Sequence, residues 1–520
     1  MRGSTPVHPF LLAAFPVLFL FAENFGETDP AEVVLPLLTS LAAASIGYVV
    51  LRILLRDTLR AAVLTSLGIA AFFLFGHAEN LLATVRLTEG KVLAGWLVLI
   101  AIAAVAIVRT RRDLGRLTLA LNVVSIVLIG NLALTIGLAF RASGAASPPG
   151  IAAEPRPTSS ASTPNAAPEQ LRDIYYIVVE DYGSRHTVLD TLGLPDTGQF
   201  EWLAAQGFHV LPETRSNYGR TPLSIASSLN MKYLDDLAAE LGPDWGDYGP
   251  LTELVRRPAA ARYLQERGYR YLQLGSQFRL TSISSIADVN PVFRDTSDFA
   301  GVLYDTTILP AIVHRLGLDD GRDGRRKNYD AFEWQLQQVS ELTAQPGPKF
   351  VFIHLFLPHH PFIVDDDGDY VPTDVDSRRT RREQQATQWG VVDAEVRAIV
   401  EPLLAGNDAT DPVIVLSTDE GPNPDGMPTV GGDLAWGSAT DAELDQKFSI
   451  FAAYYLPGVD ASALYPTMSS VNGFRLIFNL YFGADYGLLP DRSWIHRDKH
   501  HPFDLTDVTS RLDAFAAGRD

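Results

Sequence analysis

Three short polar segments of the sequence could together perform phosphate chemistry. Glu180-Asp181 and Asp419-Glu420 each follow an apolar run, and Thr221-Pro222 stands where a helix is expected to begin. Carboxylate and hydroxyl oxygens suit a hard cation such as Mg²⁺ or Mn²⁺ better than Zn²⁺. A threonine hydroxyl bound to such a cation loses its proton more easily and can attack phosphorus. These residues therefore predict a metal-activated nucleophile, provided that the fold brings them together.

The elements around these segments predict a sheet whose edge would collect them. Continuous apolar, β-branched and aromatic runs are typical of strands covered on both faces, and they occur at Asp173–Glu180, Tyr269–Leu274, Lys349–Leu357, Pro412–Leu416 and Phe448–Leu456. Helical patterns alternate with them, at Ala259–Arg267, Tyr329–Leu342, Arg378–Leu404 and Val471–Phe482. This alternation predicts a mainly parallel sheet with helices on both faces. Ligands of such sheets bind beyond the carboxyl ends of the strands, where both acidic pairs fall.

The Thr221-Pro222 pair fits the start of a helix. Proline favours the first helical position, which makes Thr221 the expected cap residue, beside free backbone N–H groups that attract phosphate. Each feature also has a simpler interpretation, since a threonine before proline can be only a cap and acids after a strand can be solvated turn residues. The occurrence of all three in one order within one domain favours a site.

Composition divides the chain into an apolar amino-terminal part and an acidic remainder. Of the 42 Lys/Arg and 61 Asp/Glu residues, 11 and 8 lie in residues 1–142, which leaves 31 and 53 for the rest. At 520 residues the chain exceeds the size of a single core, so at least two domains are expected. The acidic remainder argues against a nucleic-acid partner, because such binding depends on Lys and Arg. Cysteine is absent, which excludes disulfides and a cysteine nucleophile.

The amino-terminal part predicts an α-helical transmembrane bundle of about five spans. A span needs about 20 mainly apolar residues. Four apolar stretches are long enough and the first is short: Phe10–Ala22, Ala31–Leu55, Leu59–Phe75, Val92–Val108 and Leu117–Phe140. The first could instead be a signal peptide, although no small-residue cleavage site follows it. The links after the second and fourth stretches are rich in arginine and should face the cytoplasm, so the chain after Phe140 is expected outside the cell membrane.

Residues 143–170 are rich in Ala, Ser, Pro and Thr and predict an extended tether. The expected organisation is therefore a transmembrane domain at 1–142, a linker at 143–170 and an α/β domain at 171–520.

Residues 173–510 resemble the sulfatase-like branch of the alkaline phosphatase superfamily, and within it the membrane-anchored lipoteichoic acid synthase and phosphoethanolamine transferase group. Ile-Val-Val-Glu180-Asp181-Tyr-Gly is similar to the first metal-ligand segment of that family. The stretch from Ser216 to Leu229, with Arg-Thr221-Pro at its centre, is similar to the nucleophile segment. Val-Leu-Ser-Thr-Asp419-Glu420-Gly is similar to the second ligand segment. Five spans followed by an external domain also match the layout of the synthases.

The resemblance implies Glu180, Thr221 and Asp419 as metal ligands, with Thr221 also the nucleophile. It implies that His359, in the Pro358–Phe362 segment, contacts the substrate phosphate or leaving group, although a loop histidine without a role is the alternative. The cofactor would be one divalent cation, Mn²⁺ or Mg²⁺, with Zn²⁺ less favoured. True sulfatases need a Cys or Ser that is converted to formylglycine, and this chain lacks that segment.

One departure concerns the second ligand segment, where the family usually has Asp-His and this chain has Asp419-Glu420. Glu420 can still bind a metal, but it adds negative charge beside an anionic phosphate. The site therefore either keeps a hard cation or is degenerate. Asp181 is a further possible ligand, ranked below Glu180.

Two other clusters have simple interpretations. Arg378-Arg379-Thr380-Arg381-Arg382 is expected to be a solvated helix face, with a patch for anionic lipid or polymer as the alternative. His496, His500 and His501 are expected in an exposed loop, with a second metal site as the alternative.

The predicted function is transfer of glycerol phosphate or ethanolamine phosphate from a membrane lipid donor to a cell-envelope glycan or lipid acceptor, through a covalent Thr221 intermediate. An extracytoplasmic phosphodiesterase or phosphatase is the second hypothesis. A catalytically degenerate scaffold or binding protein of the envelope is the third, and Glu420 motivates it.

Overall fold

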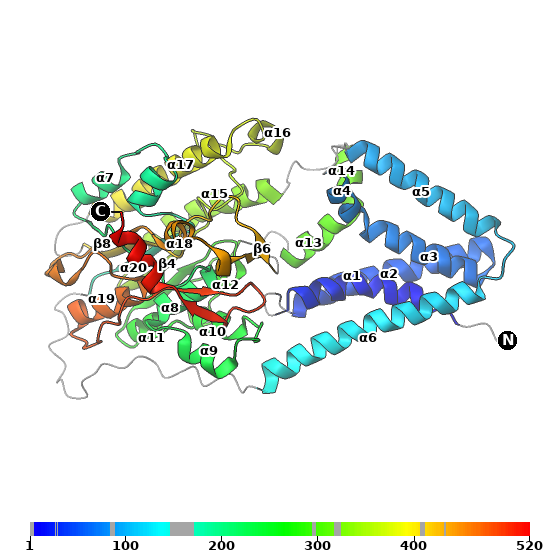
Figure 1. Cartoon of the computed structure of the whole chain (residues 1–520), viewed down its shortest axis with the longest axis horizontal. Helices are drawn as coiled ribbons and strands as arrows, with labels where there is room; N and C mark the ends of the chain where they lie inside the picture. Colours follow the sequence, from blue (N-terminus) through cyan, green and yellow to red (C-terminus); the bar gives the residue numbers. More distant parts are fainter. Residues whose placement is uncertain are drawn as a thin grey trace. The chain divides into compact units, whose positions relative to one another are not determined.

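The computed structural model describes residues 5–25, 28, 30–83, 89–145, 171–293, 298–316, 324–405, 411–430 and 433–519, which form two compact units (Figure 1). The first unit contains Met1–Ala146 and Arg294–Arg322, and the second contains Ser147–Phe293 and Asp323–Asp520. The predicted tether lies outside the described residues except for positions 143–145, which continue the last helix of the first unit. Inclusion of residues 294–322 in the helical unit was not anticipated from the sequence.

The first unit is a bundle of apolar helices. Its elements are α1 (His8–Glu23), α2 (Pro30–Leu55), α3 (Thr58–Phe73), α4 (Phe75–Ala83), α5 (Glu89–Arg109) and α6 (Gly115–Ala145). Three helices are long and apolar enough to cross a membrane, at Pro30–Leu55, Gly90–Arg109 and Gly115–Leu138. α1 and α3 have 16 residues each, and at 1.5 Å per residue they extend about 24 Å, less than the ~30 Å of a bilayer core. The count of five spans stays a prediction.

The inserted segment adds two helices to this bundle, α13 (Asp298–Thr306) and α14 (Leu309–Arg315). Phe299 of α13 joins an apolar cluster with Phe21 of α1 and Val33 of α2. Ile308, between the two helices, joins another cluster with Phe75 and Val92. All four partner residues lie near the helix ends that the loop charges place on the outer side. The insertion therefore packs on the side of the bundle where the chain after Phe140 is expected.

The second unit is built on a six-stranded sheet of order β2-β8-β5-β1-β4-β3. β1 (Ile174–Val179), β3 (Arg270–Leu274), β4 (Lys349–Leu355) and β5 (Val413–Thr418) are parallel. β8 (Ala452–Tyr455) and β2 (His209–Val210) are antiparallel to their neighbours. The prediction of a mainly parallel sheet is confirmed. The strand expected from Phe448 to Leu456 is shorter, because α18 (Asp441–Phe448) occupies its start. It also runs antiparallel to β5.

Helices cover both faces of the sheet, as the continuous apolar strands predicted. Alternate residues of β1 point to opposite faces, so Tyr176 and Ile177 belong to different cores. The core of Tyr176 includes α8 (Thr221–Asn230), α10 (Gly249–Arg256), α11 (Ala259–Gln265) and α19 (Gly473–Phe482). The core of Ile177 includes α7 (Gln199–Ala205), α15 (Gly324–Thr343) and α17 (Arg381–Leu403), and Figure 1 shows α15 and α17 across β4 from α8 and α11. This double cover holds the carboxyl ends of the strands in a rigid frame.

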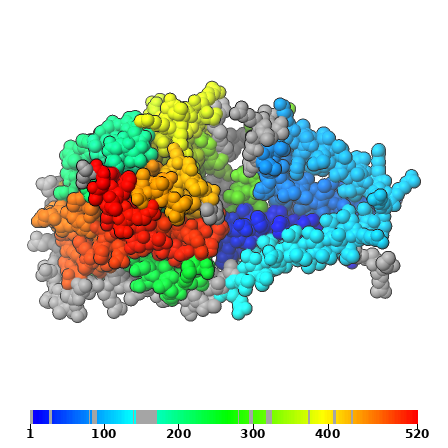
Figure 2. Space-filling model, viewed as in Figure 1, coloured from blue at the N-terminus to red at the C-terminus, as the bar shows by residue number. Residues whose placement is uncertain are grey.

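Smaller elements complete the second unit. They are α9 (Asp235–Leu241), α12 (Arg279–Ser282), α16 (Thr373–Asp376), β6 (Thr429–Val430), β7 (Asp433–Leu434), β9 (Trp494–His496), β10 (Leu505–Asp507) and α20 (Thr509–Ala517). The carboxyl-terminal helix α20 lies on the surface (red in Figure 2) and packs against α18. Just after α20, Arg519 forms an ion pair with Asp445 of α18, with 2.7 Å between nitrogen and oxygen.

Candidate metal and nucleophile site

The two acidic pairs lie side by side at the carboxyl end of the sheet. β1 and β5 are neighbours in register, with Val179 opposite Thr418, so the residues that follow them are also adjacent. Glu180, Asp181, Asp419 and Glu420 are all buried, with exposed fractions of 3–8%. Carboxylates are almost never buried without a partner or a metal ion. Their burial excludes the interpretation that they are solvated turn residues.

Asp181 has a φ of 55°, in the left-handed region that few residues other than glycine adopt. Such a conformation costs about 1–3 kcal/mol and persists where the surrounding structure holds it. The chain therefore turns sharply between Glu180 and Tyr182, which places two consecutive acids at one site.

Thr221 is buried at the start of α8, with 6% of its surface exposed. The structure corrects one detail of the prediction, because Arg220 is the cap residue and Thr221 is the first residue of the helix. Arg220 makes no side-chain cap bond. The Thr221 hydroxyl acts to lower the pKa of Asp419, but neither oxygen of Asp419 makes a hydrogen bond of normal geometry. The structure thus brings Thr221 close to the acids, as predicted.

Burial, and then mutual repulsion, raise the pKa values of three of the acids. Burial, and then the charge of Asp181, raise the pKa of Asp419 to about 6. Burial, and then the charges of Asp419, Asp181 and Glu420, raise the pKa of Glu180 well above its usual range. Burial also raises the pKa of Glu420, against the opposing charge of Lys447. Without a bound metal ion, Glu180, Asp419 and Glu420 therefore hold more protons than they would in water.

Lys447 supplies one positive charge inside the cluster and was not predicted. Its ammonium lies 3.0 Å from Glu420 and 3.5 Å from Asp181, and it donates to Asn423 at 2.7 Å. Its side chain is 1% exposed. Burial acts to lower the pKa of Lys447, but Glu420 and Asp181 outweigh it and raise this pKa above its ordinary value. The amine therefore stays charged, and it offsets one of the four carboxylates.

His354 is a second residue that the sequence analysis missed. It lies on β4, fully buried, with Nε2 3.8 Å from Glu180 Oε2. Burial, and then the charge of His359, lower its pKa to about 3, so the imidazole is neutral. Nδ1 lies 2.9 Å from the hydroxyl of Thr281, and Nε2 has no hydrogen-bond partner. A neutral imidazole held at one nitrogen, with the other free, has the form of a metal ligand or of a donor to Glu180.

His359 lies at the open side of the cluster. Its Nε2 is 3.6 Å from Asp181 Oδ2, its side chain is 24% exposed, and its Nδ1 contacts the carbonyl of His360. Within the described residues, Asp181, His359 and His360 form a group whose ligand atoms lie within 4.8 Å of one another, a spacing that could hold a metal ion. Asp181 therefore occupies a more central place than its low ranking predicted, and His360 adds a nitrogen that the sequence analysis did not assign.

The donor atoms of the site fit a divalent cation. Buried oxygens without a hydrogen-bond partner occur on Glu180, Glu420 and, for both oxygens, Asp419. Four carboxylates against one lysine leave a formal charge of −3 when all are ionised, which a divalent cation reduces to −1. The oxygens suit Mg²⁺ or Mn²⁺, whereas the imidazoles of His354, His359 and His360 also suit Zn²⁺. The residues favour a divalent metal without selecting one.

The two other clusters are largely structural. Arg379 and Arg381 lie close to Asp376 and Asp425, at 3.6 and 2.8 Å. Arg382 contacts the carbonyl of Gly193. Most of the arginine cluster is thus engaged in local contacts.

Of the three carboxyl-terminal histidines, His500 is exposed in a turn, as expected, whereas His496 is buried. His496 is buried on β9 and lies 2.8 Å from Asp433, which also pairs with Arg220 at 2.9 Å. His501 pairs instead with Asp498. His496 therefore corrects the expectation of an exposed loop, and its contact links the carboxyl-terminal region to the residue before Thr221.

No known family model and no curated protein matches this chain. Among solved structures, it is similar to the C-terminal periplasmic domain of EcEptC from Escherichia coli, with a TM-score of 0.41, 13% identity, and coverage of 68% of this chain and 96% of that chain. It is also similar to the integral membrane lipooligosaccharide phosphoethanolamine transferase A (EptA) from Neisseria meningitidis, with a TM-score of 0.38, 14% identity, and coverage of 92% and 95%. A third is a protein in the alkaline phosphatase superfamily from Vibrio parahaemolyticus, with a TM-score of 0.36, 13% identity, and coverage of 64% and 75%. The third structure is a member of the superfamily that the motifs resemble.

Proposed function

We propose that this protein is a membrane-anchored phosphotransferase that moves a phospho-alcohol group, glycerol phosphate or ethanolamine phosphate, from a lipid donor to an acceptor of the cell envelope. The observation that carries the proposal is the convergence of four buried carboxylates beside Thr221, at the functional edge of a parallel sheet. A purely structural role is a poor explanation, since Glu180, Asp419 and Glu420 all have buried oxygens without partners. Such groups are costly unless they serve binding or chemistry.

In the proposed reaction, Thr221 reacts in its deprotonated form, to which it returns at the end, and His359 starts protonated. The Thr221 oxygen attacks the phosphorus of the lipid phosphodiester. The bond between phosphorus and the diacylglycerol oxygen breaks, and His359, at the open side of the cluster, gives that oxygen a proton. The phospho-alcohol group is then held on Thr221. An acceptor hydroxyl attacks the same phosphorus, its proton passes back to His359, and the threonine oxygen is released. Atoms and charges balance over the two steps.

A divalent cation would be held by Glu180, Asp419, Glu420 and Thr221, with Asp181 as a further ligand. When bound, it would stabilise the deprotonated hydroxyl and offset charge on the phosphoryl oxygens. His354 would hold Glu180 in place from β4. The positive charge of Lys447 would offset the negative charges of Glu420 and Asp181 and so reduce their repulsion of an anionic phosphate.

The test is detection of the covalent intermediate. Purified full-length protein is incubated with phosphatidylethanolamine or phosphatidylglycerol, and the peptide containing Thr221 is examined by mass spectrometry. Wild type should gain the mass of the phospho-alcohol group on Thr221, and Thr221→Ala should gain none. Ser224→Ala is the matched control, because Ser224 lies one turn along α8 with its hydroxyl donating to the Tyr218 carbonyl. An adduct at another residue, or one that persists in Thr221→Ala, contradicts the proposal.

The phosphodiesterase or phosphatase hypothesis uses the same intermediate and differs in what releases it. If water does so, the free phosphorylated alcohol accumulates whether or not a glycan acceptor is present. The degenerate scaffold hypothesis predicts neither adduct nor binding of Mg²⁺ or Mn²⁺ at millimolar concentration.

A further inference from the structure

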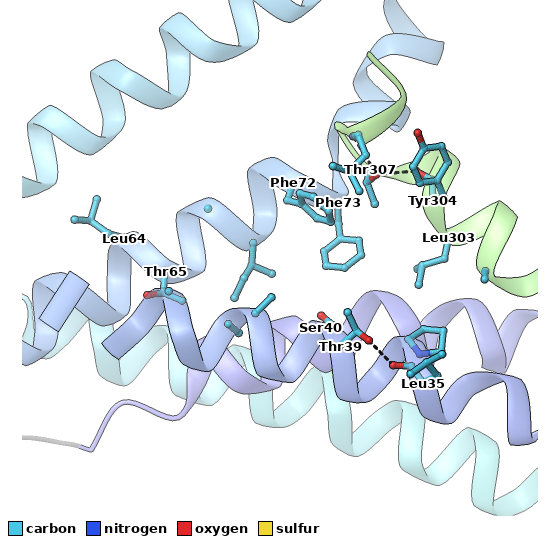
Figure 3. A pocket seen from close by; sticks show the side chains of 18 of the residues that line it. Leu35, Thr39, Ser40, Leu64, Thr65, Phe72, Phe73, Leu303, Tyr304 and Thr307 are labelled. Atoms are coloured by element: carbon cyan, nitrogen blue, oxygen red, sulfur yellow. Dashed lines mark hydrogen bonds between the residues drawn. The ribbon is translucent and has the colours of Figure 1, made fainter. Parts of the chain in front are cut away.

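The helical unit contains a large apolar groove that the phosphate chemistry does not use. It has a volume of about 610 Å³, within the range of about 300–1,000 Å³ typical of small-molecule sites. Its walls come from α2, α3 and the inserted helix α13 (Figure 3). Phe73 of α3 and Leu303 of α13 point into the space between these helices. The groove lies wholly within the first unit, so its shape does not depend on the sheet domain.

The lining is mainly apolar, and apart from the phenol of Tyr304 its side-chain hydroxyls are engaged by the backbone. Among the residues described along the groove, none is charged. The hydroxyls of Thr39, Ser40, Thr65 and Thr307 donate to backbone carbonyls of Leu35, Ala13, Ala61 and Tyr304, at 2.7–2.8 Å. A sugar or a lipid head group would lose its hydrogen bonds with water here without replacement. The groove therefore selects hydrocarbon.

Small residues create the hollow. Gly47 of α2 and Gly68 of α3 line the groove, and a methyl group added at either position would meet nothing within 4 Å. The first atom of a larger side chain at either position would therefore enter open space, so these positions are suitable for filling the groove.

The groove is long enough to hold a lipid chain from one leaflet. Along α2 its lining runs from Leu35 to Leu51, which corresponds to about 24 Å at 1.5 Å per residue. One leaflet of a bilayer has about 15 Å of hydrocarbon, half the ~30 Å core. An acyl chain that enters beside α13, at the end of the bundle expected to face outward, could lie in the groove along its whole length.

We infer that this groove binds one acyl chain of a phospholipid from the outer leaflet. The wall formed by α2 belongs to a helix long and apolar enough to cross a membrane, where hydrocarbon surrounds it, and the lining is mainly apolar. The wall formed by α13 belongs to residues 294–322, whose two ends continue directly into the sheet domain. The inference deepens the proposed function, because it assigns a holding site to the tail of the lipid donor.

The experiment is photo-crosslinking of the full-length protein in nanodiscs that contain a phospholipid with a diazirine on one acyl chain. Crosslinks in wild type should concentrate on the lining residues of α2, α3 and α13. The amount of crosslinking should be equal for phosphatidylethanolamine and phosphatidylglycerol with the same acyl chains, because the groove is inferred to bind the acyl chain and not the head group. Gly47→Leu combined with Gly68→Leu should reduce labelling of these helices about tenfold, which corresponds to ~1.4 kcal/mol of affinity.

Gly130→Leu is the matched control, since Gly130 lies on α6, is exposed, does not line the groove and has nothing within 4 Å of an added methyl group. It should leave labelling unchanged. Labels spread evenly over the exposed faces of α5 and α6 would overturn the inference, and so would labelling that survives the filled groove. Crosslinks between two copies of the chain at α2 and α3 would show that a second protomer covers the groove. The positions of the crosslinks in the wild-type protein test the inference even if the variant with the filled groove fails to fold.

The proposal of a lipid-binding groove and the proposal of phosphate transfer can be refuted separately. Thr221→Ala should keep the crosslinks in the groove while losing the covalent adduct. If wild type shows crosslinks but never an adduct, the groove stands and the proposed transfer is wrong. If an adduct forms but the crosslinks are random, the transfer stands and the donor is held elsewhere.

Discussion

Replacement of Lys447 by methionine tests whether the acid cluster is balanced from within the protein. Methionine fills a similar volume but removes the ammonium that lies 3.0 Å from Glu420 and 3.5 Å from Asp181. At an effective dielectric constant of 20, each of these pairs is worth roughly 5 kcal/mol of Coulomb energy, before desolvation. Loss of one partner from a buried ion pair typically costs about 3–5 kcal/mol. Lys447→Met should therefore lower the melting temperature of this domain of about 350 residues by about 4–7 °C in EDTA.

The loss should depend on pH and on metal. The raised pKa values of Asp419, Glu180 and Glu420 mean that these acids bind protons in the folded state at a pH where the unfolded chain has released them. Destabilisation should therefore be small near pH 4 and grow as the pH rises above about 6. Addition of Mn²⁺ or Mg²⁺ should restore much of the melting temperature, because the cation supplies the missing positive charge. The metal-induced shift should be larger in the variant than in wild type.

Lys349→Met is the matched control. Lys349 is also buried, and it pairs with Asp173 at 3.2 Å and donates to the carbonyl of Thr343 at 2.6 Å. This substitution should destabilise the protein but gain nothing from added metal. Thermal unfolding followed by tryptophan fluorescence measures both variants. The reasoning is refuted if Lys447→Met melts at the wild-type temperature in EDTA, or if metal shifts it no more than it shifts wild type.

Two further substitutions probe the frame of the site. Burial raises the pKa of Asp393 to about 6 even though Tyr182 donates to it at 2.6 Å, so ionisation of Asp393 costs the folded state ~3 kcal/mol above pH 6 and nothing below pH 4. Asp393→Asn should raise the melting temperature at pH 8 relative to wild type but not at pH 4, and equal effects at both values would contradict this assignment. Gly421→Ala should destabilise by ~1–3 kcal/mol and weaken the metal-induced shift, because the new methyl group would lie 2.8 Å from the Lys447 carbonyl. Gly437→Ala, with nothing within 4 Å, should change neither quantity.

Much of the sheet domain could be predicted because buried parallel strands leave a strong signal in the sequence. β1, β4 and β5 are continuous apolar runs, and an acid directly after such a run must fall at the carboxyl edge of the sheet. The direction of β8 could not be predicted in this way. An apolar run carries no mark of its orientation, and the helix α18 that shortens this strand ends in the same apolar residues, at Phe448.

The residues that the sequence analysis missed are polar groups whose partners lie far away in the chain. His354 is a single polar residue within the apolar run of β4, and that position was a usable signal, because a lone histidine in a buried strand needs a partner. Its partner, Glu180, lies close to it only because the neighbouring strands β1 and β4 pair in this register. Lys447 had no such signal, since a lysine near the end of a helix is usually exposed.

The inserted helices α13 and α14 were missed for a different reason. Their apolar residues read as part of a soluble core, and α13 has the length of an ordinary domain helix. Only their contacts with Phe21, Val33, Phe75 and Val92 assign them to the helical unit. The pattern of a sequence shows that a helix has an apolar surface, but it does not show which other apolar surface packs against that helix.

The pairing of Glu420 with Lys447 bears on the one departure of this chain from the family that it resembles. A glutamate in place of the usual histidine adds a negative charge next to the position expected for an anionic phosphate, which was the ground for considering a degenerate site. In the structure the same glutamate has a buried ammonium 3.0 Å from it, within the same cluster. The Glu420 carboxylate and the Lys447 ammonium together have a formal charge of zero, the same as two neutral side chains at these positions would have. Glu420 therefore does not by itself favour a dead site. The positive charge that compensates Glu420 belongs to the protein and stays when the metal is removed. For this reason, the metal dependence of Lys447→Met distinguishes a functional site from a degenerate one.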